Sequence, residues 1–483
     1  MTVAHGRLAA QLRQALGPTS VFEQVEDVIM YEYDYGLDRR MPDLVALPRS
    51  RAEVQTAVRL AQADGVPIVA RGAGTGISGG SVPARGGLIV STARMNRIVE
   101  IDTANRCAVV EPGVINLDLS KHAEAYGLFF APDPSSQKAS TIGGNIANNA
   151  GGPHCLSLGV TTNHIIGLEV VLHDGDLATL GGKAPDTTGL DLVGLMVGSE
   201  GTLGIVTEAT VRLLPLPEAV RTTLALFESV EAASEAVSAL IGRGVVPAAL
   251  EMMDKLALSA IEAAFHAGYP PEAGAVLLVE VDGLLEQVEG QADVVDTVCR
   301  QAGALEIRLA ATAEARARLW AARKGAASAM GRIAPNYYLH DAVVPRTRLP
   351  SILARVVQIA ERYDLPIANL FHAGDGNLHP MILFDVREHG ILDRVMAAGY
   401  DILTACIAAG GTITGEHGVG LEKQAYMPLV FSAADLDIMA NVRAAVDPSG
   451  LFNPDKVLPL ANGVDGMVKQ PGMRALSAEG MWV

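Results

Sequence analysis

Two histidines and a glutamate lie at turns of the chain, where metal ligands are often placed. His372 closes the apolar run 367–371, and His379 comes just before the apolar run 381–384. The residues between the histidines are rich in Gly and Asp, which favours a hairpin that brings the two imidazoles together. Glu416 lies in another glycine-flanked turn and offers a carboxylate. Two His and one carboxylate are typical of a catalytic metal site for Zn, Mn or Fe; the simpler alternative is a pair of satisfied core histidines.

A glycine-rich segment, 71–80, follows the short apolar run 67–70 and contains the spacing Gly74-x-Gly76-x-x-Gly79. After a strand, this spacing is the fingerprint of a Rossmann dinucleotide site, which must open a helix. The next residues contain Pro83 and several glycines, so that helix is not expected. The segment is predicted instead to expose successive backbone N–H groups that bind phosphate, or else to be a structural turn.

Two more segments, 132–152 and 198–208, are similarly rich in glycine and small polar residues. A run of small residues lets a ligand approach the backbone closely. Three such segments in the first half of the chain predict a long, flat, phosphate-bearing ligand that runs between them.

Composition excludes several classes of protein. The chain has 483 residues, with 37 Lys and Arg against 54 Asp and Glu, giving a net charge of −17. A nucleic-acid-binding protein would need a basic surface, so that class is not expected. The cysteines are widely spaced and form no C-x-x-C pair, which argues against an iron–sulfur cluster, a zinc ribbon or a disulfide framework; they are Cys107, Cys155, Cys299 and Cys406.

The N-terminal 20 residues lack the apolar core and cleavage site of a signal peptide. No segment approaches the roughly 20 apolar residues that span a bilayer. We therefore expect a cytoplasmic protein that reaches the membrane, if at all, through partner subunits.

The residue pattern changes after Pro217: the glycine-rich segments end, and strand and helix patterns begin to alternate. Strands are predicted at 222–227, 275–282, 366–371 and 380–384, and helices at 229–242, 312–329, 349–363 and 392–408. The expected domains are an N-terminal helical segment (1–40), a ligand-binding domain (41–217), a second domain (218–430) and a C-terminal helical segment with a loose tail of about 20 residues (431–483).

The three glycine-rich segments together resemble the FAD-binding domain of the vanillyl-alcohol oxidase type. Some members attach FAD through a His in the first segment, where this chain has Thr75, so the resemblance implies noncovalent FAD. The positions that it implies for FAD binding are Arg71, Gly72, Ala73, Gly74, Thr75, Gly76, Ser78, Gly79, Pro132, Asp133, Ser136, Ser140, Gly143, Gly144, Asn148, Gly151, Glu200, Gly204, Ile205 and Asn453.

Two motifs of the second half, 371–380 and 414–420, resemble the FAD-linked 2-hydroxy-acid dehydrogenases. This family includes D-lactate and D-2-hydroxyglutarate dehydrogenases and the FAD-linked subunit of bacterial glycolate oxidase, to which the similarity extends over about 20–460. The implied fold is α+β: a vanillyl-alcohol oxidase/PCMH-type FAD domain, a substrate (cap) domain with a ferredoxin-like sheet, and a C-terminal helical segment that returns to the flavin.

The resemblance also implies roles for single residues. His372, His379 and Glu416 would hold a divalent ion, and His417 would take the hydroxyl proton of a 2-hydroxy acid while hydride passes to flavin N5. Arg323 would bind the substrate carboxylate through its guanidinium fork; the alternative is a solvated helix arginine.

The size of the substrate is predicted from residues that are missing. Relatives specific for hydroxyglutarate have polar side chains where this chain has Ala327, Leu339 and Met381. A second carboxylate buried there would lack partners, so glycolate or D-lactate is expected.

The reoxidation of the flavin has more than one possible route. The resemblance implies a second FAD-domain subunit and an iron–sulfur subunit that pass electrons to membrane quinone; an electron-transfer flavoprotein or a soluble quinone is the alternative. Two other functions stay open: a stand-alone D-lactate or D-2-hydroxyglutarate dehydrogenase, and a catalytically silent flavin subunit.

Overall fold

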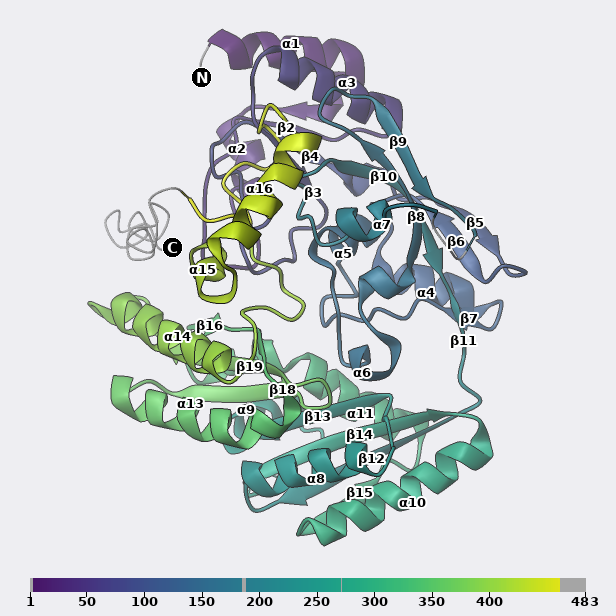
Figure 1. Ribbon diagram of the computed structural model, residues 1–483, viewed down its shortest axis with the longest axis vertical. Helices are drawn as coiled ribbons and strands as arrows, with labels where there is room; N and C mark the ends of the chain where they lie inside the picture. Colours follow the sequence, from purple (N-terminus) through teal and green to yellow (C-terminus); the bar gives the residue numbers. More distant parts are fainter. Residues whose placement is uncertain (1–2, 185–187, 271, 461–483) are drawn as a thin grey trace. The chain divides into compact units, whose positions relative to one another are not determined.

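The computed structural model describes residues 3–184, 188–270 and 272–460, and the predicted C-terminal tail from 461 onward lies outside them. The chain forms two compact units (Figure 1). Unit 1 contains the described residues of Met1–Gly151, Val160–Leu216 and Glu416–Val483, and unit 2 those of Gly152–Gly159 and Pro217–Gly415.

Unit 1 begins with a four-stranded sheet in the order β1-β2-β4-β3. Strands β2, β3 and β4 are parallel, and β1 is antiparallel to β2. The apolar sides of α1 and α3 pack together against this sheet. Ser50 caps α3 by accepting a hydrogen bond from the Glu53 N–H. The bounds are α1 Val3–Leu16, β1 Val21–Phe22, α2 Val25–Val28, β2 Leu44–Ala46, α3 Arg51–Ala63, β3 Ile68–Arg71 and β4 Leu88–Ser91.

A second sheet of unit 1 has five antiparallel strands in the order β5-β6-β10-β8-β9. Alternate residues of β10 are buried, as expected for a strand with one face on a core. The bounds are β5 Ile98–Asp102, β6 Cys107–Val110, α4 Asn116–Glu124, β7 Leu128–Phe129, α5 Ile142–Asn148, β8 Ile165–Val171, β9 Leu177–Gly181, α7 Leu192–Met196, β10 Ile205–Arg212, β11 Leu214–Pro215, α15 Met427–Val430 and α16 Ala433–Val446.

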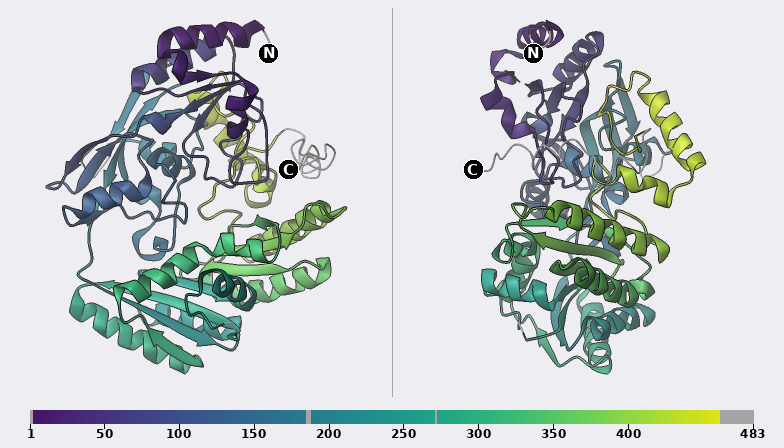
Figure 2. Two further views of the ribbon diagram at one scale, coloured as in Figure 1. Left: turned by 180° about the vertical axis from the view of Figure 1, so that it is seen from behind. Right: turned by 90° about the vertical axis from the view of Figure 1, so that its left-hand side faces the viewer.

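Unit 2 is built on one antiparallel sheet in the order β15-β12-β14-β13-β18-β19-β16, with β17 beside β19. Its first four strands have the order of a ferredoxin-like sheet. Helices line both faces (Figure 2). The bounds are α6 Cys155–Leu158, β12 Ala219–Phe227, α8 Val230–Gly242, β13 Ala249–Asp254, α9 Lys255–Phe265, β14 Ala275–Gly283, α10 Leu285–Gln301, β15 Glu306–Leu309, α11 Ala313–Lys324, α12 Ala326–Ala329, β16 Asn336–Leu339, β17 Ala342–Val343, α13 Leu349–Tyr363, β18 Ile367–His372, β19 Asn377–Phe384 and α14 Ile391–Ala408.

The predicted strands and helices of the second half are present, with two differences. The helix expected at 312–329 is broken at Gly325, where an added Cβ would lie 2.3 Å from a ring carbon of Phe265. His379 does not open β19 but is its third residue, because pairing with β18 begins at His372 and Asn377.

None of the helices in the described ranges is both long and apolar enough to cross a bilayer.

Candidate active site

The three glycine-rich segments of unit 1 lie against one another. A Cβ on Gly72 would be 2.4 Å from Oγ1 of Thr141, so the first and second segments touch through a position that only glycine fits. The Gly198 N–H donates to the Ile146 carbonyl at 2.8 Å, which joins the third segment to the second. The prediction that one ligand meets all three segments is therefore compatible with their placement.

The first segment has backbone donors to spare. Within the described ranges, none of the backbone N–H groups from Ala73 to Gly79 donates to a protein acceptor. Gly74 and Gly79 have φ of +72° and +75°, conformations in which consecutive N–H groups can converge on an anion. Arg71 is buried beside this segment, and its guanidinium carbon lies 5.5 Å from the ring centre of Tyr31. The segment thus has the donors and the charge that a pyrophosphate requires.

The second segment holds buried polar groups that no described residue satisfies. They are the Ser140 hydroxyl and the amide nitrogen of Asn145. A buried donor without an acceptor is costly, so such groups indicate a polar ligand or water at this place. Within the described residues, the unpaired backbone donors of the first segment and the unsatisfied polar groups of the second both fit FAD.

The C-terminal part of the chain ties the first and third segments together. The side-chain amide of Asn453 donates to the carbonyls of Gly80, at 2.8 Å, and Glu200, at 2.7 Å. The Lys456 ammonium donates to the Val82 carbonyl at 2.5 Å and to Oδ1 of Asn453 at 2.9 Å. Burial lowers the pKa of Lys456 to about 8. Asn453 therefore links the first glycine-rich segment to the third.

His417 is attached to the same loops. Its backbone carbonyl accepts hydrogen bonds from the Ser78 hydroxyl, at 3.0 Å, and from the Asn148 amide, at 2.9 Å. Ser78 belongs to the first segment, and Asn148 ends α5 in the second. The predicted base is thus joined to two predicted FAD-binding positions.

Glu200 fixes the residues that follow His417. Its carboxylate accepts N–H bonds from Val419, at 2.7 Å, and from Gly420, at 2.8 Å. Burial raises the pKa of this carboxyl, and the two N–H bonds oppose that rise. The side chain of Glu200 is therefore committed to the loop 417–420.

The other predicted FAD positions of unit 1 differ in their surroundings. The Pro132 carbonyl accepts a bond from Asn116 at 2.9 Å, and the Ser136 carbonyl accepts one from the Ser140 N–H at 2.8 Å. Gly143 packs on Pro112, where a Cβ would be 2.7 Å from that ring's Cβ. Further positions on the same segments, some of them buried, are Asp133, Gly144, Gly151, Gly204 and Ile205.

In unit 2, His372 and His379 lie on neighbouring strands of one hairpin. Their ring centres are 4.9 Å apart, with an interplanar angle of 86°. Nδ1 of His372 lies 2.6 Å from Oε1 of Glu251 on β13. A histidine bonded to a carboxylate through Nδ1 presents Nε2 to other ligands. The predicted hairpin is therefore present, and it brings the two imidazoles together.

Arg323 is not a solvated surface residue. It is only 5% exposed, and its Nη2 lies 2.5 Å from Oε2 of Glu251. Arg323 and then His372 hold the pKa of Glu251 below its usual value, against the opposing effect of burial. Nε of Arg323 has no acceptor among the described residues. That donor remains for an anionic ligand.

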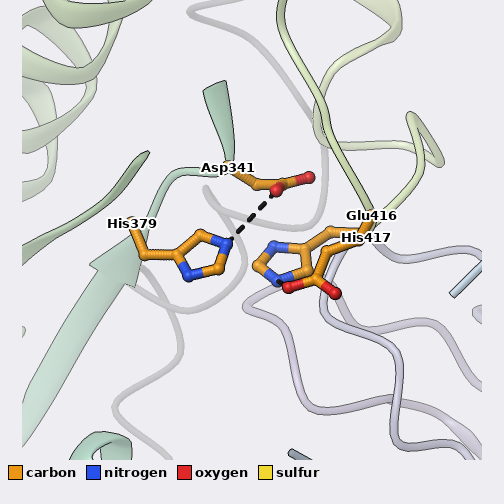
Figure 3. A group of neighbouring side chains, drawn as sticks. All are labelled: Asp341, His379, Glu416 and His417. Atoms are coloured by element: carbon orange, nitrogen blue, oxygen red, sulfur yellow. Dashed lines mark hydrogen bonds and ion pairs between the residues drawn. The ribbon is translucent and has the colours of Figure 1, made fainter. Parts of the chain in front are cut away.

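Asp341 is a further buried carboxylate of unit 2. It accepts hydrogen bonds from the Thr414 hydroxyl, at 2.6 Å, and from the Gly415 N–H, at 2.9 Å, and its Oδ1 lies 3.3 Å from Nε2 of His379. The last of these contacts is the dashed line in Figure 3. Asp341 thus fixes the end of unit 2 from which the chain continues into Glu416.

Figure 3 also draws Glu416 and His417, the two residues that come after Gly415. The side chains of Asp341, His379, Glu416 and His417 all offer atoms that metal ions bind. This ligand group includes Asp341 and His417, which the sequence did not mark as ligands, and omits His372, whose Nδ1 faces Glu251.

The positions expected to limit substrate size share one apolar cluster of unit 2. Met381 is buried in it, and Ala327 and Leu339 pack against it. Leu339 and Met381 are paired across β16 and β19.

Sequence reasoning missed the buried charged residues around these sites. They are Glu251, Asp341 and Lys456, each fully buried. Glu251 lies in the apolar stretch of β13. A charged residue inside such a stretch is unusual, and this could have marked Glu251 as a functional residue. No comparable signal marks the other two.

Comparisons with known proteins cover most of the chain. Residues 42–181 match the family described as "FAD binding domain", and residues 216–457 match "FAD linked oxidases, C-terminal domain". The chain is 45% identical over 450 residues to glycolate oxidase subunit GlcD of Escherichia coli K12, covering 93% of this chain and 90% of that protein. It is 44% identical to the Bacillus subtilis subunit of the same name, covering 92% and 96%. D-lactate dehydrogenase of Anaerostipes hadrus is 32% identical, covering 88% and 90%.

Solved structures of the same fold are more distant in sequence. The 4-ethylphenol oxidase of Gulosibacter chungangensis superposes with a TM-score of 0.81 at 17% identity, covering 95% of this chain and 98% of that one. p-Cresol methylhydroxylase gives 0.81 at 18%, covering 96% and 98%. The predicted fold class is thereby confirmed. The chain belongs to the FAD-linked oxidase family and is an FAD-dependent oxidoreductase.

Proposed function

We propose that the chain oxidises a small 2-hydroxy acid, glycolate or D-lactate, to the 2-oxo acid. The relatives named as glycolate oxidase subunits and D-lactate dehydrogenase support this substrate class. The observation that carries the proposal is the attachment of the His417 carbonyl to Ser78 and Asn148 of the FAD-binding segments. A base held in this way has a defined position relative to the flavin loops.

The roles of the site residues follow from the chemistry of the reaction. Noncovalent FAD, when bound, would supply the acceptor for the hydride of the substrate Cα, and a divalent ion would supply a charge that lowers the pKa of the substrate hydroxyl. His417 takes the hydroxyl proton on a ring nitrogen. Arg323 binds the substrate carboxylate through donors such as Nε.

The ion is proposed to be held by His372, His379 and Glu416. Nδ1 of His372 contacts Glu251, so Nε2 is the proposed ligand atom, and the ring of His379 is close by. The donor set of two imidazoles and a carboxylate suits Zn, Mn or Fe. Asp341 is a rival ligand, since it is buried against His379.

The small size of the substrate is supported by the apolar cluster around Met381. Ala327 and Leu339 add no polar side chain to it, so a second carboxylate there would be buried without a partner, at a cost of several kcal/mol.

The electrons are proposed to leave through other subunits. Two relatives are named as subunits of glycolate oxidase, which suggests an assembly. The candidate metal-ligand group of the described residues contains no cysteine, and the four cysteines of the chain form no C-x-x-C pair. An iron–sulfur relay to membrane quinone would therefore come from a partner, together with a second FAD-domain subunit.

Anaerobic mixing with candidate substrates tests the proposal. Glycolate, D-lactate, L-lactate and D-2-hydroxyglutarate are each added to the purified flavoprotein, with and without divalent ions, and the flavin absorbance is followed. We expect rapid bleaching with glycolate or D-lactate that depends on the ion. A strong preference for D-2-hydroxyglutarate would contradict the assigned substrate, and no bleaching with any of them would contradict the proposed reaction.

A further inference from the structure

We propose that Glu251 is a positioning residue that fixes the metal ligand His372 and the carboxylate-binding Arg323 at the same time. The inference rests on the proposed function for what these two residues bind. It is carried by the geometry of unit 2 alone.

The contact of Glu251 with His372 is set by the sheet. Glu251 and His372 are partners across β13 and β18, so their side chains emerge side by side from paired backbone positions. The resulting distance from Oε1 to Nδ1 is 2.6 Å, and Glu251 is 0% exposed. The bond to Nδ1 selects the imidazole tautomer that presents Nε2.

The second oxygen of Glu251 faces Arg323 at the end of α11. The distance from Oε2 to Nη2 is 2.5 Å. A buried guanidinium and a buried carboxylate compensate each other, and removal of one leaves the other charge unpaired. Because both oxygens are used, one carboxylate sets the distance between the imidazole and the guanidinium.

The spacing between His372 and Arg323 matters for the geometry of the substrate. A 2-hydroxy acid has its hydroxyl and its carboxylate on adjacent carbons, so the groups that bind them must keep a fixed spacing. Loss of Glu251 would therefore weaken both ion binding and substrate binding.

The test compares three variants of the full chain. Glu251→Gln keeps an acceptor for His372 and loses the charge facing Arg323, and Glu251→Leu loses both. Glu280→Gln is the matched control: Glu280 is a buried glutamate on the adjacent strand β14 whose carboxylate lies 3.4 Å from His154 and accepts a bond of 2.7 Å from Trp320. Zn²⁺ and Mn²⁺ affinities are measured by titration, KM and kcat for glycolate and D-lactate with a dye acceptor, and FAD content by absorbance.

We expect Glu251→Gln to bind the ion about 10-fold and Glu251→Leu about 100-fold more weakly, the range found when a residue that holds a metal ligand in place is lost. KM should rise in both, FAD content should stay at one per chain, and Glu280→Gln should match the wild type in all of these. If Glu251→Leu does not fold, Glu251→Gln decides. Unchanged ion affinity and KM in the Glu251 variants overturn the inference alone; a wild-type chain that binds no ion overturns the proposed metal site, and the inference with it.

Discussion

The hydroxyl of Ser78 donates a hydrogen bond of 3.0 Å to the backbone carbonyl of His417. The two residues are 339 positions apart in the chain. One belongs to a glycine-rich segment with free backbone donors, and the other has an imidazole able to accept a proton. The bond therefore couples the position of the proposed base to the position of a predicted FAD-binding segment.

Replacement of His417 by Asn should leave FAD bound and slow flavin reduction by at least about 100-fold, the lower range for a lost general base. Stopped-flow absorbance under anaerobic conditions measures the rate. The exposed His122 on α4 offers a control, since His122→Asn should reduce at the wild-type rate.

Metal content separates two possible roles of His417. A base can be removed without loss of the ion, whereas His417 is also among the candidate ligands. If the His417→Asn variant loses the ion along with activity, His417 is a ligand and its assignment as base is wrong.

Replacement of Arg323 by Lys should raise KM for the hydroxy acid by roughly 10- to 100-fold, because a buried guanidinium fork gives up about 1.5–3 kcal/mol of charge-assisted bonding. Steady-state kinetics measures KM. Arg318→Lys, at an exposed position of the same helix, is the control. Equal KM in the two variants would show that Arg323 does not bind the substrate.

Replacement of Gly72 by Val should lower the FAD content. The added Cβ would lie 2.4 Å from Thr141 Oγ1, so the first and second glycine-rich segments would have to separate. The ratio of flavin to protein absorbance checks this. Gly242→Ala, where nothing lies within 4 Å of the added atom, should keep full FAD content.

The buried Asp38 should make stability depend on pH. Burial raises its pKa from 3.8 to about 6. The folded state then binds this proton more tightly than the unfolded state does. The contribution of Asp38 to the free energy of unfolding is therefore fully present below about pH 4. It falls by up to about 3 kcal/mol as the pH rises through 6. Asp38→Asn removes this titration.

Thermal unfolding at several pH values tests the assignment. The Tm of Asp38→Asn, relative to wild type, should become more positive between pH 4 and pH 7. Asp437→Asn, on an exposed face of α16, should show no such trend. A constant difference for Asp38→Asn would mean that its carboxyl titrates normally in the folded chain.

Treatment with a chelator should abolish turnover and leave the FAD in place. Two of the proposed ligands, His372 and His379, belong to unit 2 and the third, Glu416, belongs to unit 1, but none of the three is among the predicted FAD-binding positions. Activity should return when a divalent ion is added back. Full activity in a chain shown to be free of metal would exclude a role for the ion.

Local patterns predicted about half of the elements of unit 2; the longest element that they missed is the helix α10. The apolar runs on either side of His372 and His379 predicted the hairpin, and the ring centres lie 4.9 Å apart. The break at Gly325 was missed; this glycine packs against the ring of Phe265 in another helix, a contact that the local pattern does not contain.

Contacts between distant parts of the chain could not be predicted. Glu251 and His372 meet because β13 pairs with β18, and nothing near either residue specifies that pairing. In the sequence, nothing distinguishes Lys456 from a surface lysine. In the fold it is buried and donates hydrogen bonds to Asn453 and to Val82, which is distant in the chain. The family resemblance supplied Asn453 as a flavin position, but not its bridge between two loops.

The short segment Gly152–Gly159 belongs to unit 2, although it is enclosed in sequence by unit 1. It carries His154, which contacts Glu280, and Leu156, which packs over Gly374 beside the histidine hairpin. A gene fragment that encodes 217–415 alone would therefore lack a half-buried segment that packs on its strands. Swapping this unit between relatives requires that both stretches be exchanged together.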